Sequence, residues 1–328
     1  MPIIAIDARE ARAARPRGRG RYARELIAAL RRLGVHDLRE EVGGIGPEVL
    51  REQVGWPGRL ARQRADLVHA AGGVLPLRRP CPGLVSVHDL AFEAHPTDLA
   101  PRAAWRHRTF VPRSVRSAEL TLCGSAFTAA DVATRYGVDP GKLRVVPYAP
   151  ALARGAAPLP GGAPYLLAVG DGRPSRNLER LVAAFAALRA GELPDHRLVL
   201  AGAATPGRPP AGAGVEVTGW LDDERLDALM RGADVLVHPS LYDGAGLVVL
   251  EAMARGVPVA AAEAAALPAM CTDAAELFDP FDPAAIAAAV LRARARRTEL
   301  VAAGRARAEL FTWDATAEAT ALVYRELL

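Results

Sequence analysis

Two carboxylates flank a glycine-containing segment in the second half of the chain. Asp243 and Glu251 stand at the ends of the run Asp-Gly-Ala-Gly-Leu-Val-Val-Leu-Glu, in which Gly244 and Gly246 allow the backbone to approach a ligand closely. Free N–H groups at the start of the following helix favour an anion such as a diphosphate. The two acids are spaced to hold two pairs of hydroxyls, one from a sugar and one from a ribose. The alternative is a turn residue at Asp243 and a solvated helix residue at Glu251.

Two arginines occupy a second glycine-containing turn. Arg173 and Arg176 lie within Val169–Asn177, where a predicted strand runs into a predicted helix. Guanidinium groups in this place would neutralise a departing diphosphate without a metal. An ordinary turn with exposed arginines is the other interpretation.

Gly18 and Gly20 are a third and weaker signal. They lie in Arg17–Tyr22, between the predicted first strand and the predicted first helix. Backbone N–H groups there would face phosphates or a donor sugar. A pair of glycines also fits a tight connection between a strand and a helix.

His88 follows a predicted strand and therefore stands at its carboxyl end, where parallel sheets bind ligands. Its imidazole would hydrogen-bond a substrate hydroxyl, although a lone histidine is often structural. His69 ends an earlier strand in a similar way. We interpret His238, which precedes Asp243 at the end of a strand, as a packing residue.

Short apolar runs alternate with helical periodicity along the chain, which favours parallel sheets covered by helices. In the first half we expect a helix at Tyr22–Leu33, a helix that ends at Tyr136 with Ser125 as its N-cap, and strands at Pro2–Asp7, Asp66–His69, Leu84–Val87, Leu120–Cys123 and Arg144–Val146. In the second half we expect helices at Asn177–Ala190, Asp222–Arg231 and Leu247–Arg255, and strands at Tyr165–Val169, Arg197–Ala201, Val215–Thr218, Asp234–His238 and Pro258–Ala261.

The repeated pattern predicts two Rossmann-like α/β domains whose parallel sheets face a central cleft. The stretch from Pro147 to Pro164 is rich in Pro, Gly and Ala and lacks periodicity, which is typical of a linker. We expect an acceptor-side domain at 1–150, a linker at 151–163, a nucleotide-sugar-binding domain at 164–311 and a C-terminal helix at 312–328 that packs back toward the first domain.

The composition excludes several function classes. The 328 residues carry a net charge of +4, but the cations are spread along the chain, so we expect no nucleic-acid partner. Cys81, Cys123 and Cys271 lack metal-ligand spacing, and no Asp-x-Asp motif occurs, so we expect no metal and no disulfide framework. Neither a membrane span nor a signal peptide is evident, which predicts a cytoplasmic protein.

As a set, these residues resemble the retaining GT-B glycosyltransferases of family 4, which include bacterial mannosyltransferases. The resemblance covers nearly the whole chain and is most specific in Ser240–Leu247 and Glu251–Val259. It implies that Glu251 binds ribose hydroxyls, that Asp243 faces the donor sugar and that Arg176 contacts the diphosphate. It further places His88 at the reacting centre on the acceptor side. The donor site that it implies also includes Gly18, Gly20, Arg173, Gly244, Ala245, Gly246 and Leu247.

The chain departs from the family pattern at four places. Asp243 is one methylene shorter than the usual Glu, and Ser175 stands in place of an Arg. Ala245 replaces a frequent Phe, and Pro147–Ala149 lacks the usual hinge glycine. We therefore expect Arg173 to compensate for Ser175, and a wider donor pocket at Ala245.

The resemblance implies a retaining transferase that moves a hexose-type sugar from a UDP- or GDP-sugar to an unidentified acceptor: a glycan, a lipid-linked glycan or a secondary metabolite. The nucleotide-sugar is a co-substrate, and we expect no cofactor. The leaving diphosphate would take the acceptor proton, since no positioned carboxylate nucleophile is evident. The alternatives are a catalytically inactive GT-B protein that binds sugars or partners, and a GT-B sugar-nucleotide epimerase.

The segment Arg102–Arg116 combines basic residues with Trp105 and Phe110. It would guide a lipid-linked or anionic acceptor and make peripheral contact with the inner face of a membrane. The alternative is an ordinary surface helix. The oligomeric state is not indicated by the sequence.

Overall fold

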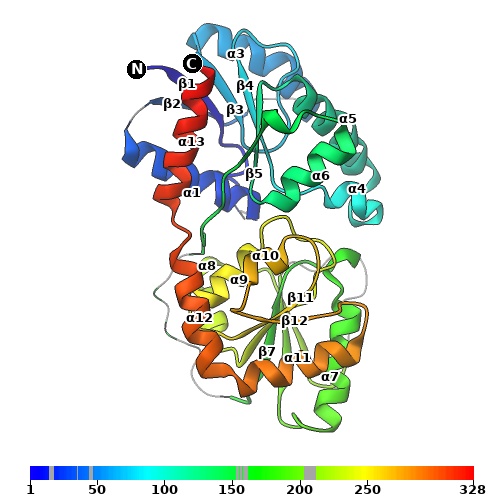
Figure 1. Ribbon diagram of the computed structural model, residues 1–328. Coiled ribbons are helices and arrows are strands. Elements are labelled where there is room, and N and C mark those ends of the chain that lie inside the picture. Colours follow the sequence, from blue (N-terminus) through cyan, green and yellow to red (C-terminus); the bar gives the residue numbers. More distant parts are fainter. Residues whose placement is uncertain are drawn as a thin grey trace. The chain divides into compact units, whose positions relative to one another are not determined.

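The computed structural model describes residues 1–14, 18–34, 36–43, 47–152, 155, 157, 162–202 and 212–328. These residues form two compact units (Figure 1). Unit 1 consists of Met1–Ala149 together with Phe311–Leu328, and unit 2 consists of Pro150–Leu310. Of the predicted linker, the structure describes 151–152, 155, 157 and 162–163.

Unit 1 is built around a parallel sheet with the strand order β2-β1-β3-β4-β5-β6 among the described residues. The central strands are mostly apolar and fully buried, as expected for a parallel sheet with both faces covered. The strands are β1 (Ile3–Asp7), β2 (Asp37–Glu41), β3 (Leu67–Ala70), β4 (Gly83–Val87), β5 (Leu120–Cys123) and β6 (Leu143–Val145).

Helices cover this sheet, and the C-terminal helix α13 lies alongside α1 within unit 1 (Figure 1). Ser125 caps α6 by accepting the N–H of Thr128, as predicted. The helices and short helical turns are α1 (Gly18–Leu33), α2 (Glu48–Leu50), η1 (Arg51–Gly55), α3 (Trp56–Gln63), α4 (Ala91–Ala94), η2 (Pro96–Asp98), α5 (Pro101–Ser117), α6 (Ala126–Tyr136), η3 (Pro140–Lys142) and α13 (Trp313–Leu327).

The predicted start of the first helix at Tyr22 is wrong, because α1 begins at Gly18. Gly18 and Gly20 therefore lie in the first turn of the helix instead of in a loop before it. First-turn N–H groups make no intrahelical bonds, and the buried face formed by Tyr22, Leu26 and Leu30 stabilises the helix through its packing. Arg17 lies outside the described residues.

Unit 2 repeats the design with the strand order β12-β11-β10-β7-β8-β9, again parallel throughout the described part. Its strands are β7 (Tyr165–Val169), β8 (Arg197–Ala201), β9 (Val215–Gly219), β10 (Val235–His238), β11 (Val259–Ala262) and β12 (Glu276–Phe278). Its helices are η4 (Pro174–Arg176), α7 (Leu178–Ala190), α8 (Asp223–Arg231), α9 (Leu247–Met253), α10 (Leu267–Cys271), α11 (Pro283–Ala295) and α12 (Arg297–Glu309).

Candidate functional site

The strand order of unit 2 reverses between β7 and β10. The chain proceeds from β7 to β8 on one side of the sheet and from β10 to β11 on the other. The connections that follow β7 and β10 therefore lead to opposite edges of the sheet, although both start at neighbouring carboxyl ends. Such a switch point is where open α/β sheets bind ligands. The two loops carry the predicted residues Arg173, Arg176 and Asp243.

Hydrogen bonds join these two loops. The N–H of Leu241 donates to the carbonyl of Ser175 at 2.8 Å. The side-chain amide of Asn177, a residue in the left-handed region at φ 57°, donates to the carbonyl of Pro239 at 3.1 Å. Ser175, which stands where the family has an arginine, is itself buried and packs inside the protein. The loops thus form one structural unit at the switch point.

The two arginines of the first loop are partly exposed and paired with acids. Arg173 Nε lies 2.7 Å from Asp171 Oδ1. Arg176 Nη1 donates to Ser240 Oγ at 3.1 Å and lies 3.6 Å from Asp243 Oδ2. Arg176 Nε is buried and makes no hydrogen bond with any described residue. The guanidinium of Arg176 thus connects both loops.

Asp243 shapes its own turn. Its Oδ1 accepts the N–H groups of Ala245 at 3.1 Å and Gly246 at 2.7 Å, while its Oδ2 lies 2.9 Å from His238 Nε2. Burial alone would raise the pKa of this carboxyl. The hydrogen bond and charge of His238, the charge of Arg176 and the N–H of Gly246 together hold that pKa well below its usual range. Asp243 is therefore ionised at neutral pH.

This turn corrects one detail of the predicted anion site. The N–H groups of Ala245 and Gly246 are used by Asp243, so they are not free to face a diphosphate. The helix α9 is also shorter than predicted, since it begins at Leu247 and ends at Met253. Gly246 has a φ of +65°, and a Cβ there would lie 3.0 Å from the side chain of Met270. Both features favour a glycine at the start of α9.

Glu251 is buried in α9 instead of solvated. Its Oε1 accepts the N–H of Leu152 at 3.1 Å, and Arg255 Nη2 donates to the carbonyl of the same Leu152 at 3.0 Å. Arg255 in turn pairs with Asp227, and both side chains are almost completely buried. The carboxylate of Glu251 is thus anchored in a network that holds the beginning of unit 2.

His88, in unit 1, lies just after β4 and has both ring nitrogens engaged. Nε2 lies 2.8 Å from the carbonyl oxygen of Ala71, and Nδ1 lies 3.0 Å from the hydroxyl of Tyr148. A carbonyl only accepts, so Nε2 carries the proton and Tyr148 donates to Nδ1. Burial lowers the pKa of His88 to about 4, which keeps the imidazole neutral at pH 7. Its predicted contact with a substrate hydroxyl would have to replace one of these bonds.

Gly18 and His69, two other predicted positions in unit 1, show no feature that indicates ligand binding. A Cβ built on Gly18 would meet nothing within 4 Å, so space does not require a glycine there. His69 is a core residue whose ring nitrogens lie 2.7 Å from the hydroxyl of Tyr324 and 2.8 Å from that of Ser86.

The interpretation of His238 as a packing residue missed its contact with Asp243. The side chain is buried, as packing predicts, but its Nε2 lies within hydrogen-bond distance of the Asp243 carboxylate. The available signal was the spacing of five residues across a strand end and a turn.

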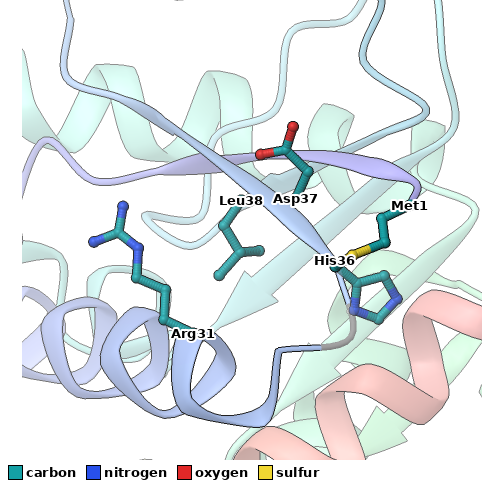
Figure 2. A pocket seen from close by; sticks show the side chains of 5 residues that line it. All are labelled: Met1, Arg31, His36, Asp37 and Leu38. Atoms are coloured by element: carbon teal, nitrogen blue, oxygen red, sulfur yellow. The ribbon is translucent and has the colours of Figure 1, made fainter.

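Two hollows in unit 1 lie elsewhere. One, of about 550 Å³, is found near the amino end of β2 and is lined by Met1, Arg31, His36, Asp37 and Leu38 (Figure 2). In parallel sheets ligand sites form at the opposite, carboxyl ends, so this hollow is not a site candidate.

The other hollow, of about 620 Å³, lies between η2 and α5. It is lined by Trp105, Arg108 and Arg113 among others, and Trp105 is 57% exposed. It therefore falls within the predicted segment Arg102–Arg116.

The described residues contain no group of His, Cys, Asp and Glu side chains that could hold a metal ion. They also contain no helix with the length and apolar character that a membrane crossing requires.

Comparisons with known proteins show the family of the chain. The family model described as "Glycosyl transferases group 1" matches residues 163–296, and the model "Glycosyltransferase Family 4" matches residues 45–149. The MMP alpha-(1->4)-mannosyltransferase of Mycolicibacterium hassiacum is 31% identical over 66% of this chain and 56% of its own length. The chain spans about half the length of the curated relatives that it matches, at 46% and 56% for two of them.

Solved structures establish the fold. Sucrose-phosphate synthase from Thermosynechococcus elongatus superposes with a TM-score of 0.78 at 22% identity, covering 100% of this chain and 99% of its own. Anabaena HepE in complex with UDP-glucose gives a TM-score of 0.75 at 17% identity, with 100% of both chains covered. The two parallel α/β units therefore form the predicted GT-B fold.

Proposed function

Because the chain belongs to the glycosyltransferases of group 1 and family 4, we propose that it transfers a hexose-type sugar from a UDP- or GDP-sugar to a glycan, a lipid-linked glycan or a secondary metabolite. Anabaena HepE, which shares the fold, is described in complex with UDP-glucose, and this supports a nucleotide-sugar as the donor.

The observation that carries this proposal is the array at the switch point of unit 2. Arg176 stands between Ser240 and Asp243, and its Nε lacks a hydrogen bond to any described residue. This Nε faces Asp171 Oδ1 at 3.9 Å without a hydrogen bond, and a diphosphate oxygen would supply a closer acceptor. We assign the diphosphate to Arg176 and Arg173, the donor sugar to Asp243 and the ribose to Glu251.

The proposed chemistry is retention without a metal. The cations stabilise the charge that develops on the leaving diphosphate, which takes the acceptor proton on the same face of the sugar. Asp243 is ionised, and Arg176 balances its negative charge. Its carboxylate orients the sugar hydroxyls and does not attack the sugar. For unit 1 we keep the roles that the sequence predicts, with His88 as a partner of an acceptor hydroxyl and Gly18 and Gly20 as donor-binding residues. EDTA should leave the rate unchanged.

A thermal-shift panel tests the donor class. UDP, GDP, ADP and dTDP, each with and without its sugar, are added to the whole chain. A ligand at 100 times its dissociation constant adds about 2.7 kcal/mol to the free energy of unfolding, which is easily seen as a shift. We expect a shift with UDP or GDP and their sugars. No shift with any nucleotide would contradict the proposal.

Glu251→Gln should weaken the binding of the nucleoside diphosphate by roughly 10-fold to 150-fold. The amide oxygen still accepts the N–H of Leu152, so the fold is retained, but the charge that accepts ribose hydroxyls is lost. A hydrogen bond to a charged group contributes about 1.5–3 kcal/mol. Calorimetry with the diphosphate measures the effect, and Glu224→Ala on the exposed face of α8 serves as control. Unchanged affinity would remove Glu251 from the donor site.

We also propose a cytoplasmic location with peripheral membrane contact through Arg102–Arg116. The exposed Trp105 borders the hollow at α5, and Arg108 and Arg113 line it. Aromatic rings and cations together favour anionic lipid surfaces. The chain should co-sediment with anionic vesicles at low salt, and Trp105→Ala should reduce the bound fraction. The absence of binding to such vesicles would leave α5 as an ordinary surface helix.

A further inference from the structure

His238 is the last residue of β10, a strand that is otherwise apolar. Its side chain is 2% exposed, and buried polar groups in folded proteins are almost always hydrogen-bonded. Its Nε2 lies 2.9 Å from Asp243 Oδ2. The end of β10 thus places a buried hydrogen-bond donor beside Asp243, the carboxylate that we assign to the transferred sugar.

The carboxylate is held from two sides. The N–H groups of Ala245 and Gly246 bind Oδ1, and His238 binds Oδ2. The short side chain of aspartate suits this arrangement, because Asp readily bonds to its own backbone two or three residues later. A Glu would move the carboxylate one methylene away from both sets of donors. The departure from the family pattern at Asp243 and the histidine at the end of β10 are thus parts of one arrangement.

The arrangement extends to the cation of the site. Asp243 Oδ2, which His238 binds, lies 3.6 Å from Arg176 Nη1, and the same Nη1 donates to Ser240 Oγ. A carboxylate that is free to turn away from the arginine would leave the guanidinium with Ser240 alone. The orientation of Asp243 therefore affects where Arg176 stands.

We propose that His238 is a positioning residue of the donor site, whose Nε2–H holds the Asp243 carboxylate beside Arg176. It does not touch the substrate and acts through these two side chains. The inference rests on the proposed function, since it takes Asp243 and Arg176 as donor-binding groups. Small displacements of reacting or charge-stabilising groups are costly, and a shift of about 1 Å changes a rate by roughly 100-fold.

Three substitutions separate this role from simple packing. The amide nitrogen of Gln reaches the place of Nε2, whereas that of Asn reaches only the place of Nδ1, and Leu fills the volume without a donor. His238→Leu and His238→Asn should lower kcat/KM for the sugar nucleotide by roughly 10-fold to 100-fold, mainly through kcat. His238→Gln should recover most of the loss.

A matched control exists in the same unit. His196 Nε2 makes an equivalent contact with Asp234 Oδ2 at 3.0 Å, at the amino ends of the strands. His196→Leu removes a buried histidine–aspartate contact far along the sheet from the proposed site. It should change thermal stability and leave kcat/KM as in the wild type. Tm is measured for all variants beside the kinetics.

The readouts distinguish two failures. A wild-type chain that binds no nucleoside diphosphate overturns the proposed function, and the role of His238 with it. A wild type that binds and reacts, with His238→Leu equally active, overturns the role of His238 alone. The role is also overturned if the activities of His238→Leu, His238→Asn and His238→Gln decrease in step with their Tm values. It predicts instead that activity depends on whether the side chain places a hydrogen-bond donor where Nε2 lies. As a ligand-independent check, the ¹⁵N resonance of His238 Nε2 should shift in Asp243→Asn, and an unchanged resonance contradicts the contact.

Discussion

Arg176→Ala should lower the turnover of the sugar nucleotide by roughly 10²-fold to 10³-fold, which is typical for the loss of one preorganised donor to developing charge. The contact of Arg176 with the diphosphate should strengthen as the glycosidic bond breaks. Turnover should therefore fall more than ground-state donor affinity does. Steady-state kinetics and calorimetry on the same preparation measure both quantities.

Two further arginine substitutions serve as comparisons for this prediction. Arg225→Ala, on an arginine with a 76% exposed side chain in the same unit, should have no effect on turnover. Arg173→Ala should cost less than Arg176→Ala. If Arg173 shares the role that Ser175 leaves open, the two losses will be strongly non-additive. Full turnover in Arg176→Ala would contradict the assignment of the leaving group to this residue.

Asp227→Ala should lower the free energy of unfolding by about 3–5 kcal/mol, as removal of one partner of a buried ion pair does. Its partner Arg255 has a completely buried side chain, so the substitution leaves a charge without compensation. Asp227 also accepts the N–H of Gly155 at 3.1 Å and the Nε of Arg231 at 3.0 Å. Urea unfolding followed by circular dichroism measures the loss.

Glu224, exposed on the same helix α8, supplies the control. Glu224→Ala should stay within about 0.5 kcal/mol of the wild type. Equal stabilities of Asp227→Ala and Glu224→Ala would show that the buried network does not hold unit 2 together. Because Arg255 also binds the carbonyl of Leu152, Asp227→Ala should further loosen the surroundings of Glu251.

Much of this fold is predictable from hydrophobic periodicity. The strands at Leu120–Cys123, Tyr165–Val169 and Arg197–Ala201 have the bounds that the sequence predicts. These are short apolar runs in buried parallel sheets, where local pattern and tertiary environment agree.

The strand β2 could not be predicted in this way. Its sequence, Asp-Leu-Arg-Glu-Glu, is charged and lacks alternation. It is held at the sheet edge by pairing with β1 and by arginines from elsewhere in unit 1, such as Arg31 on Glu40 and Arg59 on Glu41. The pairing with β1 joins segments that are far apart in the sequence, so no local window shows it.

The candidate site divides in the same manner. The types and spacing of Arg173, Arg176 and Asp243 indicate a site at two strand ends, and the strand order of unit 2 brings these ends together. The pairing of His238 with Asp243 and the burial of Glu251 against Leu152 depend on side-chain geometry. The five-residue spacing of His238 and Asp243 is compatible with their contact, but the burial of Glu251 against Leu152 has no signal in the sequence.

The most direct test of the central claim is a crystal structure of the chain with the nucleoside diphosphate that the thermal-shift panel selects. We predict diphosphate oxygens within about 3 Å of the guanidinium of Arg176 and ribose hydroxyls at Glu251. A nucleotide bound elsewhere, such as in the hollow beside Trp105 with the switch point of unit 2 empty, would contradict it.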